Sequence, residues 1–307
     1  MPAFELTPAD EARHLVGTDA LWGESWYHDF AAPDGSSGGY TRLGLYPNLG
    51  VVWFWLHLVR RGRPLVALRD HVASCPPPDA PLEVTTDRYR TSWRCVEPVQ
   101  TWRISASGTA VELADPAAAF HGEEGPEVPV AVDLEWRGAV PVYPYPQTTR
   151  YEQAAWVEGQ VVIGDERIAV RCPGERDHSW GPRDWWALPW LWTSGHLDDG
   201  RWFQAVRSLI PTAGDRNLQV GFVAEPNRPL EPVARTAFTP ELDDEQLLVR
   251  GDLEIDRHHL TVAAELAAPV LLVSPEGRES RFARALARFE TTDGRAGRGW
   301  TELNWPQ

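Results

Sequence analysis

The sequence predicts a mainly β protein, and three observations indicate this class. Short runs in which apolar residues alternate with other residues recur along the 307-residue chain, as in strands of antiparallel sheets. Gly, Pro, Asp or Asn separates most of these runs, which is typical of tight turns. Segments with a helical pattern are few, so a sandwich or an antiparallel barrel is favoured over a parallel sheet with crossover helices.

The clearest strand pattern covers residues 51–59. One parity of this run carries Trp53, Trp55 and His57, and the other carries Phe54 and aliphatic residues, so both faces of the strand are apolar. One face could pack in a core while the other lines a ligand cavity. Further strands are predicted, in chain order, at 82–86, 101–105, 130–136, 160–163, 167–172, 202–210, 218–224, 247–255 and 260–266.

Two short helical patterns and one proline-rich segment complete the predicted organisation. A helix is predicted at 8–15 and a short turn at 240–247. Residues 139–147 contain three prolines, which exclude a central strand and favour an extended connector. We therefore expect two β domains, 1–142 and 148–307, with a similar amount of strand pattern in each.

Composition and charge exclude several classes of function. Hydrophobic residues make up 43% of the chain and charged residues 24%, which are ordinary values for a globular protein. The formal net charge of -15 repels phosphate backbones, so nucleic acid is not an expected partner. All 29 basic residues are arginine, and the absence of lysine excludes Schiff-base, pyridoxal and phosphate-loop lysine chemistry.

Cysteine usage and the amino terminus predict a cytoplasmic protein. Cys75, Cys95 and Cys172 are too few and too scattered for a disulfide framework and show no metal or redox spacing. The first residues lack the cationic and apolar pattern of an export signal, and no run reaches membrane-spanning length, so no integral membrane segment is expected. The adjacent histidines His258 and His259 would diverge on a strand, and we assign no metal and no cofactor.

The most informative segment is residues 174–186, with the sequence GERDHSWGPRDWW. It packs paired charges, one imidazole and three indoles between turn formers. Burying charge beside indole is costly unless the charge is paired, and such surroundings also shift the pKa of an acid, so we interpret the segment as the centre of a site. Adjacent residues on an extended strand face opposite sides, so either Asp177 or His178 is expected to point inward as a proton donor. Charge and orientation would then be supplied by Arg176, Arg183 and Asp184. The alternative is an ion-paired corner that performs no chemistry.

Aromatic residues supply the expected lining of a cavity. The chain has 16 tryptophans, and they cluster in the sequence. Indole rings can line a pocket for a polycyclic or isoprenoid molecule and can stabilise positive charge on carbon, although an aromatic core would look the same in the sequence. Two carboxylates that lie among aromatic residues, Glu152 and Glu302, are expected to pair with Arg176 or Arg183. The predicted substrate-binding residues are Trp53, Trp55, Trp180, Trp185, Trp186 and Tyr151.

Three motifs give the second half a resemblance to a known family. These are residues 151–153, residues 174–185 and residues 299–302, and the segment R-D-H-x-W-G within 174–185 is the most recognisable. With them the chain resembles the carotenoid 1,2-hydratase and tocopherol cyclase-like group, which is related to AttH-like proteins and to certain fungal Diels-Alderases. The resemblance implies two lipocalin-like, calycin-type antiparallel β-barrel domains in tandem. It also implies cofactor-free hydration, cyclisation or pericyclic ring closure of an isoprenoid or polyketide-like substrate.

The sequence therefore predicts a metal-free lyase, either a hydratase or a cyclase, that acts on a hydrophobic small molecule. Asp177 and His178 are the candidate catalytic residues, because a buried acid can protonate a carbon–carbon double bond. A non-catalytic lipocalin-like carrier of a hydrophobic metabolite remains the alternative. A third possibility is a structural scaffold without a continuous cavity. The oligomeric state stays open.

Overall fold

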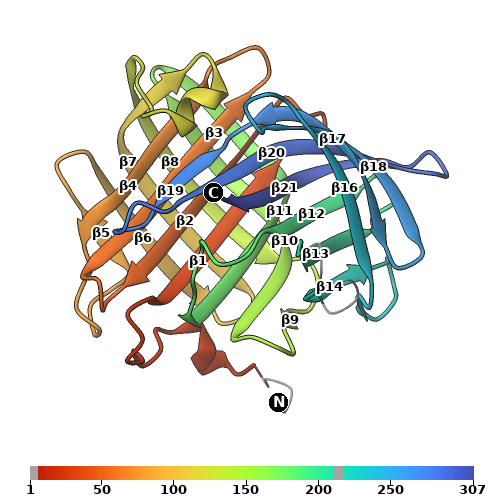
Figure 1. The fold of residues 1–307 in the computed structure, drawn as a ribbon, viewed down its shortest axis with the longest axis horizontal. Helices are drawn as coiled ribbons and strands as arrows, with labels where there is room; N and C mark the ends of the chain where they lie inside the picture. Colours follow the sequence, from red (N-terminus) through yellow and green to blue (C-terminus); the bar gives the residue numbers. More distant parts are fainter. Residues whose placement is uncertain (1–5, 211–216) are drawn as a thin grey trace.

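The predicted mainly β class is confirmed by a computed structural model, which describes residues 6–210 and 217–307. Its strands form two antiparallel sheets, of eleven and ten strands. In Figure 1 the first sheet occupies the left of the molecule and the outer strands of the second sheet the right, with β1, β2, β11, β20 and β21 between them. The tandem lipocalin-like architecture expected from the resemblance agrees with this arrangement.

The first sheet closes on itself. Its order is β4-β3-β2-β1-β11-β10-β8-β7-β6-β5, β9 pairs with β10, and a further pairing of β4 with β7 joins eight of the strands into a ring. The strands of this sheet are β1 (Trp22–Ala31), β2 (Ser37–Tyr46), β3 (Val51–Arg60), β4 (Leu65–Ser74), β5 (Glu83–Thr85), β6 (Tyr89–Glu97), β7 (Thr101–Leu113), β8 (Glu127–Gly138), β9 (Tyr143–Pro144), β10 (Arg150–Ile163) and β11 (Glu166–Pro182).

The second sheet has the order β15-β14-β13-β12-β21-β20-β18-β17-β16, and β19 pairs with β20. A hydrogen bond from the Arg207 guanidinium to the carbonyl oxygen of Thr236 connects β13 to the edge strand β16. The strands of this sheet are β12 (Trp190–Leu197), β13 (Trp202–Ser208), β14 (Gln219–Ala224), β15 (Glu231–Pro232), β16 (Thr236–Leu242), β17 (Leu248–Ile255), β18 (His258–Ala267), β19 (Val270–Val273), β20 (Glu279–Thr291) and β21 (Ala296–Pro306).

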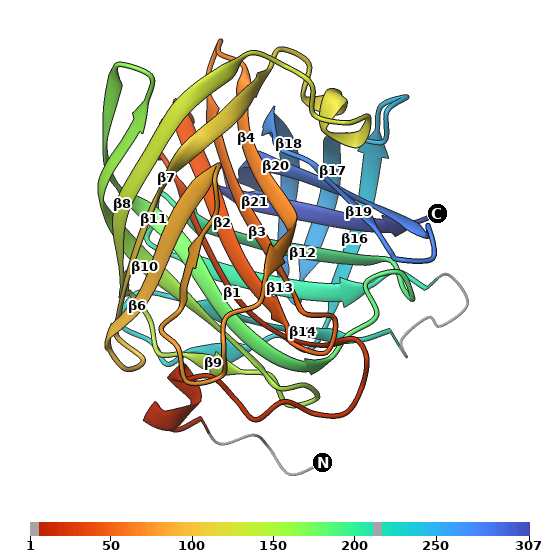
Figure 2. The ribbon, with the colours of Figure 1, turned by 90° about the vertical axis from the view of Figure 1, so that its left-hand side faces the viewer.

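Helical structure in the described residues is limited to two 3₁₀ segments, η1 (Pro8–Glu11) and η2 (Pro116–Phe120). The helix predicted at 8–15 is wrong beyond Glu11, because the backbone N–H of His14 donates to the Glu24 carboxylate and draws the chain into an extended path. Both views place η1 beneath one end of the ring (Figures 1 and 2). Neither described helical segment has the length and apolar character needed to cross a membrane. The cytoplasmic location stays a prediction.

All the predicted strands are present, and several strands escaped prediction. One of these is β2, whose glycines interrupt the apolar alternation. Their missing side chains are used for packing: a Cβ on Gly39 would lie 2.7 Å from Leu58, and one on Gly44 would lie 2.5 Å from the Arg42 guanidinium. Glycine in this strand therefore marks close approach of neighbouring groups instead of a loop.

The division between the sheets does not coincide with the predicted domain boundary. Strands β10 and β11 follow the proline-rich segment 139–147 in sequence, yet they pair with β8 and β1 of the first sheet. The chain passes to the second sheet only through residues 183–189. The prolines do prevent a long strand, but the short strand β9 still pairs with β10 through Pro144 and Tyr143.

Three large groups of buried apolar residues, with two smaller ones beside them, fill the described part of the molecule. One lies inside the ring and includes Trp26, Trp102 and Trp136, and another lies against the inner face of the second sheet. The third, which we call the inter-sheet cluster, joins residues of β1 to β4 with residues of the second sheet and of segment 183–189. Its aromatic members are Tyr27, Tyr40, Tyr46, Trp53, Trp55, Tyr145, Trp185, Trp186, Trp192, Phe282 and Trp300.

Trp300 on β21 is expected to be a principal contact between the two sheets. Its indole is fully buried, donates to the carbonyl oxygen of Phe30 at 3.0 Å and packs edge-on against Tyr40. Trp300→Ala should lower the free energy of unfolding by about 3–5 kcal/mol. Urea denaturation measures this change. Trp156→Ala, which removes an indole that is 48% exposed, is the control and should cost much less; equal losses in both variants would contradict the packing described here.

Candidate functional site

Strand β11 directs the residues of the central motif to two separate sides. Arg176 and His178 point into the ring, where His178 stacks on Trp26 with ring centroids 4.5 Å apart. Glu175 and Asp177 have the opposite parity and face the second sheet. Asp177 lies opposite Tyr27 of β1 and Glu152 of β10 in the strand register. Asp177 and His178 therefore belong to different sites.

The side of β11 that faces the second sheet carries an excess of buried carboxyl groups. We call this set the acid cluster; its members are Asp29, Glu152, Glu175, Asp177 and Glu302, each no more than 6% exposed. Within the described residues, only the guanidinium groups of Arg150 and Arg284 pair with them. Five carboxylates against two cations would leave a net charge of about -3 in an apolar interface, so protonation of some of them is favoured.

Arg150 joins two members of the acid cluster. Its NH2 nitrogen lies 2.6 Å from Glu152 Oε1 and 2.8 Å from Asp177 Oδ2. Glu152 Oε1 also accepts hydrogen bonds from Tyr145 at 3.0 Å and from the Trp192 indole at 3.1 Å. Glu152 Oε2 is buried and has no hydrogen-bond partner among the described residues. One oxygen of Glu152 is therefore held by donors, and the other is free to carry a proton.

Burial governs the protonation of this cluster. It raises the pKa of Glu152 to about 8, with Arg150 acting against the shift and Asp177 adding to it. Burial likewise raises the pKa of Asp29 to about 7, although the Tyr27 hydroxyl at 2.8 Å favours its ionised form. The pKa of Glu175 is raised well above its ordinary value by burial and by the nearby Glu152 carboxyl. Burial thus favours the protonated form of these three acids.

Glu302 and Arg284 contribute the second sheet's charges to the same interface. They face one another across β20 and β21 and form an ion pair, and Arg284 also donates to the Tyr27 hydroxyl. The prediction that Glu302 or Glu152 pairs with Arg176 or Arg183 is wrong. A cross-strand neighbour, Arg284, is the partner of Glu302. Glu152 pairs instead with Arg150, which lies two residues earlier on the same strand and the same face of the sheet.

Four of the six predicted substrate-binding aromatics lie between the two sheets. They are members of the inter-sheet cluster, namely Trp53, Trp55, Trp185 and Trp186. The last two belong to segment 183–189. Trp186 donates to the carbonyl oxygen of Leu272 at 3.3 Å. The two remaining residues, Trp180 and Tyr151, lie with His178 on the other side of the sheet.

Arg42 lies within the aromatic part of the inter-sheet cluster. Its guanidinium lies 4.8 Å from the Trp55 ring centroid and 4.9 Å from that of Trp185, and NH2 donates to Tyr46 at 3.1 Å. The side chain is 4% exposed, NH1 has no acceptor, and no ion pair holds it within the described part of the chain. The Arg183 guanidinium also lies over the Trp185 ring, 5.1 Å from the ring centroid. Burial and the nearby Arg150 lower the pKa of Arg183 to about 10.

The structure places Asp184 outside the site. It is exposed and pairs with Arg278 at 3.1 Å, so the prediction that it holds the central motif in register is wrong. Its carboxylate stays in water because residues 183–189 leave the sheet after Pro182 and run along the surface.

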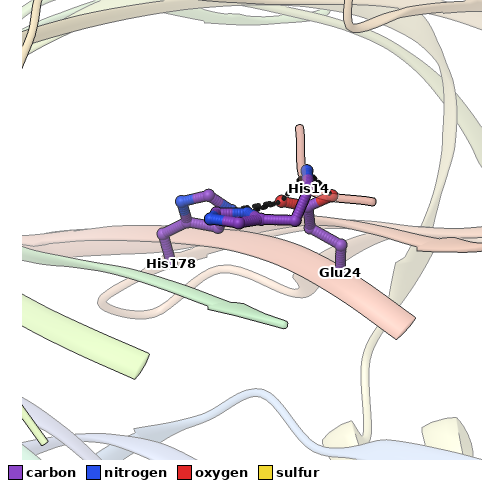
Figure 3. A group of neighbouring side chains, drawn as sticks. All are labelled: His14, Glu24 and His178. Atoms are coloured by element: carbon purple, nitrogen blue, oxygen red, sulfur yellow. Dashed lines mark hydrogen bonds and ion pairs between the residues drawn. The ribbon is translucent and has the colours of Figure 1, made fainter. Parts of the chain in front are cut away.

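The side of β11 that faces the interior of the strand ring carries a second set of polar residues, which we call the N-terminal polar cluster. Glu11 accepts from Arg176 at 2.9 Å, from Tyr151 at 2.5 Å and from Trp102 at 2.8 Å. His178 Nε2 lies 2.9 Å from Glu24 Oε1 (Figure 3). The cluster is completed by Asp10 and by His14, whose ring stacks on Trp180 at 3.7 Å. His178 and Tyr151 are therefore packed among charged partners within the N-terminal end of the ring.

A cleft of about 310 Å³ opens at the other end of the inter-sheet region. Trp156, His196 and Arg298 line it, and a small pocket that shares His196 and Arg298 continues inward to Asp29 and Glu175. Glu152 lies near Glu175 and raises the pKa of that acid. The cleft and the small pocket thus lead from the surface toward the acid cluster.

Several residues of the site gave no usable signal in the sequence. Asp29, Arg42, Arg150 and Arg284 are isolated charges within or beside strand patterns, and their meeting depends on sheet register and sheet packing. Glu175 is the one residue of the acid cluster that was not predicted but could have been identified from the sequence. It belongs to the central motif and has the same strand parity as Asp177.

Comparisons with known proteins support the fold. A family model described as a domain of unknown function, DUF7064, matches residues 7–307. A Nitrosomonas europaea protein assigned as AttH is 16% identical, with a TM-score of 0.66 over 98% of this chain and 96% of that chain. Kievitone hydratase from Nectria haematococca is 10% identical, with a TM-score of 0.60 over 93% and 90%. CghA is 12% identical, with a TM-score of 0.54 over 93% and 88%.

At these identities the structural similarity concerns the fold alone. The expected resemblance to AttH-like proteins is confirmed at that level, whereas a relation to carotenoid hydratase or tocopherol cyclase stays a prediction. No curated protein sequence matches this chain.

The raised pKa of Glu152 should make stability depend on pH. Between the ordinary carboxyl pKa of 4.5 and the folded-state value of about 8, the folded protein holds a proton that the unfolded chain releases. This contribution to stability is complete below pH 4.5 and is lost as pH rises through 8. From pH 5 to pH 8, wild type should therefore lose stability relative to Glu152→Gln, by more than about 1.4 kcal/mol, the equivalent of one pKa unit.

Urea denaturation of both proteins at pH 5, 6.5 and 8 measures this difference. The matched control is Glu158→Gln, which changes a half-exposed glutamate on the same strand and should leave the pH dependence as in wild type. A constant difference between wild type and Glu152→Gln over this range would show that Glu152 is ionised in the folded protein.

Proposed function

This chain belongs to the family described as domain of unknown function DUF7064, and we propose that it catalyses cofactor-free proton transfer to a carbon–carbon double bond of a hydrophobic small molecule. The outcome is hydration or cyclisation of an isoprenoid or polyketide-like substrate. The observation that carries the proposal is Glu152, a fully buried acid with a raised pKa, placed beside an aromatic cluster, with one oxygen that has no partner among the described residues.

Glu152 is the proposed proton donor. A general acid works best when its pKa lies near the working pH, and the pKa of Glu152 meets that condition. The proton on Oε2 forms the new C–H bond with the π electrons of the alkene and leaves a carbocation. Trp192 and Tyr145 hold Oε1, so the carboxyl group keeps its orientation when it becomes a carboxylate.

Asp177 is the proposed partner of Glu152 in the same reaction. Both carboxyl groups share Arg150, whose side chain keeps 16% exposure and marks the end of the acid cluster nearest to solvent. Water or an internal hydroxyl of the substrate adds to the cation, and its surplus proton passes to one of these carboxylates. Addition of water and return of a proton balance the reaction, so neither a redox partner nor a cofactor is required.

The aromatic part of the inter-sheet cluster is the proposed substrate-binding region. Indole faces attract positive charge on carbon, which suits Trp192, the member of this cluster whose indole contacts Glu152. Arg42 offers one donor, NH1, that has no acceptor among the described residues and would hold an oxygen of the substrate. Segment 183–189 would have to open for a substrate to enter, because Trp185 and Trp186 are buried within this cluster.

One observation from outside the chain agrees with the proposal at a coarse level. One neighbour in fold is a hydratase by name, and it shares the architecture over 93% of this chain. Fold alone does not transfer an activity, so the proposal depends on the acid cluster of this chain. His178 takes no part in the proposed step, because it faces the interior of the ring.

The test is conversion of isoprenoid, polyene and polyketide-like substrates in D₂O. An alkene that is protonated by the enzyme gains one carbon-bound deuterium, which mass spectrometry of the product detects. Glu152→Gln should lower turnover about 100- to 10,000-fold, the usual contribution of a general acid. Asp177→Asn should also lower it, and Glu158→Gln, on the same strand but exposed, should match wild type.

The same experiment separates the rival functions. If the protein is a carrier, the hydrophobic ligand should quench its tryptophan fluorescence on binding. The ligand would then be recovered unchanged and without deuterium. A scaffold would show no ligand-dependent fluorescence. Undiminished conversion by Glu152→Gln would remove Glu152 as the proton donor.

A further inference from the structure

The N-terminal polar cluster contains three groups whose ligand atoms converge. His14 precedes β1, Glu24 lies on β1 and His178 lies on β11. His14 Nδ1 is 2.7 Å and His178 Nε2 is 2.9 Å from the same oxygen, Glu24 Oε1, and one ligand atom from each residue lies within 4.8 Å of the others. Figure 3 shows both imidazole rings directed at this carboxylate.

The outer nitrogen of each ring also has a partner. His14 Nε2 lies 3.3 Å from Asp10 Oδ1, and His178 Nδ1 lies 3.3 Å from the Tyr151 hydroxyl oxygen. Histidines that bind metal ions usually donate their other ring N–H to a carboxylate or a similar acceptor, which fixes the tautomer and the ring orientation. Asp10 and Tyr151 occupy these outer positions here.

The hydrogen bonds of Tyr151 determine how His178 must be protonated. Tyr151 donates its only hydrogen to Glu11 Oε2 at 2.5 Å, so the contact with His178 needs a hydrogen on Nδ1. A neutral His178 then turns the lone pair of Nε2 toward the Glu24 oxygen at 2.9 Å. In this tautomer Nε2 offers its lone pair on the side where the Glu24 oxygen and the His14 ring also meet, which is the arrangement a cation needs.

The charges around the site leave room for a divalent cation. Within the described residues, the cluster contains the carboxylates of Asp10, Glu11 and Glu24 and a single guanidinium, that of Arg176. Apart from the two imidazoles, three negative charges and one positive charge leave a net charge of about -2. Glu24 is only 2% exposed and His178 is fully buried, so a charge imbalance at this place is costly.

We propose that His14, Glu24 and His178 bind a divalent first-row transition metal ion such as Zn²⁺. Two imidazoles and one carboxylate are a common ligand set for these ions, with His14 Nδ1 and His178 Nε2 as the nitrogen ligands. Binding replaces the protons between the rings and Glu24 by the metal and releases them to water. Asp10 and Tyr151 orient the two rings.

The site would fasten the N-terminal segment to the ring. His14 is the ligand from this segment, and the other two ligands come from paired strands of the first sheet. It is distinct from the proposed proton transfer, because His178 and Asp177 face opposite sides of β11. The inference therefore stands or falls independently of the proposed function.

The test is binding of Zn²⁺ and Co²⁺ to the full chain after removal of metal with a chelator. Wild type should bind one ion per chain, with a visible Co²⁺ absorption band that Zn²⁺ abolishes. His14→Ala should weaken binding more than about 100-fold, and Asp10→Asn should weaken it about 10- to 100-fold, as expected for an outer partner. His259→Ala, which removes an exposed histidine of the second sheet, should bind as wild type does.

The contrary reading is that protons alone hold the two rings on Glu24. In that case Zn²⁺ would not raise the melting temperature of wild type beyond that of His14→Ala, and both proteins would bind Zn²⁺ equally. Such a result would overturn the proposal. His14 keeps 19% exposure, so its replacement should be tolerated by the fold even where Glu24→Gln or His178→Ala is not.

Discussion

The structure depends on how buried carboxyl groups are neutralised between its two sheets. Five acids meet two guanidinium groups in the acid cluster, and the burial of all five limits how far water can compensate for the difference. Protonation is the remaining means, and it is favoured by burial and by repulsion between neighbouring carboxyl groups. The excess of buried carboxyl groups, which is costly to the fold, therefore also provides acids with pKa values near neutral pH.

The alternation of strand β11 divides the motif between two tasks. Its odd positions, Glu175 and Asp177, serve the acid cluster, and its even positions, Arg176 and His178, serve the N-terminal polar cluster. Each side has its own counter-charges, from Arg150 on one and from Glu11 and Glu24 on the other. The motif that looks like one site in the sequence thus contributes residues to two separate clusters. A substitution on one side of β11 should therefore leave the contacts on the other side in place.

Local patterns predicted what local geometry determines. Alternation at 51–59 placed Trp53 and Trp55 on one face, and the pairing of charge with indole at 174–186 identified the strand on which both clusters are built. Partners could not be predicted in the same way. Glu302 meets Arg284 through the register of β20 and β21, and Glu11 reaches Arg176 across 165 positions of sequence. The second sheet begins after Pro182 because β10 and β11 are needed to complete the ring, which no composition change reveals.

The central claim is that Glu152 is a neutral acid in the folded protein. Difference infrared spectroscopy of wild type against Glu152→Gln tests it most directly, because a protonated carboxyl group has a C=O stretch separate from the bands of carboxylates. Our account expects a protonated-carboxyl band at pH 7 that is missing in Glu152→Gln and fades as pH rises through about 8. A carboxylate band for Glu152 at pH 7, with no such protonated signal, would contradict it.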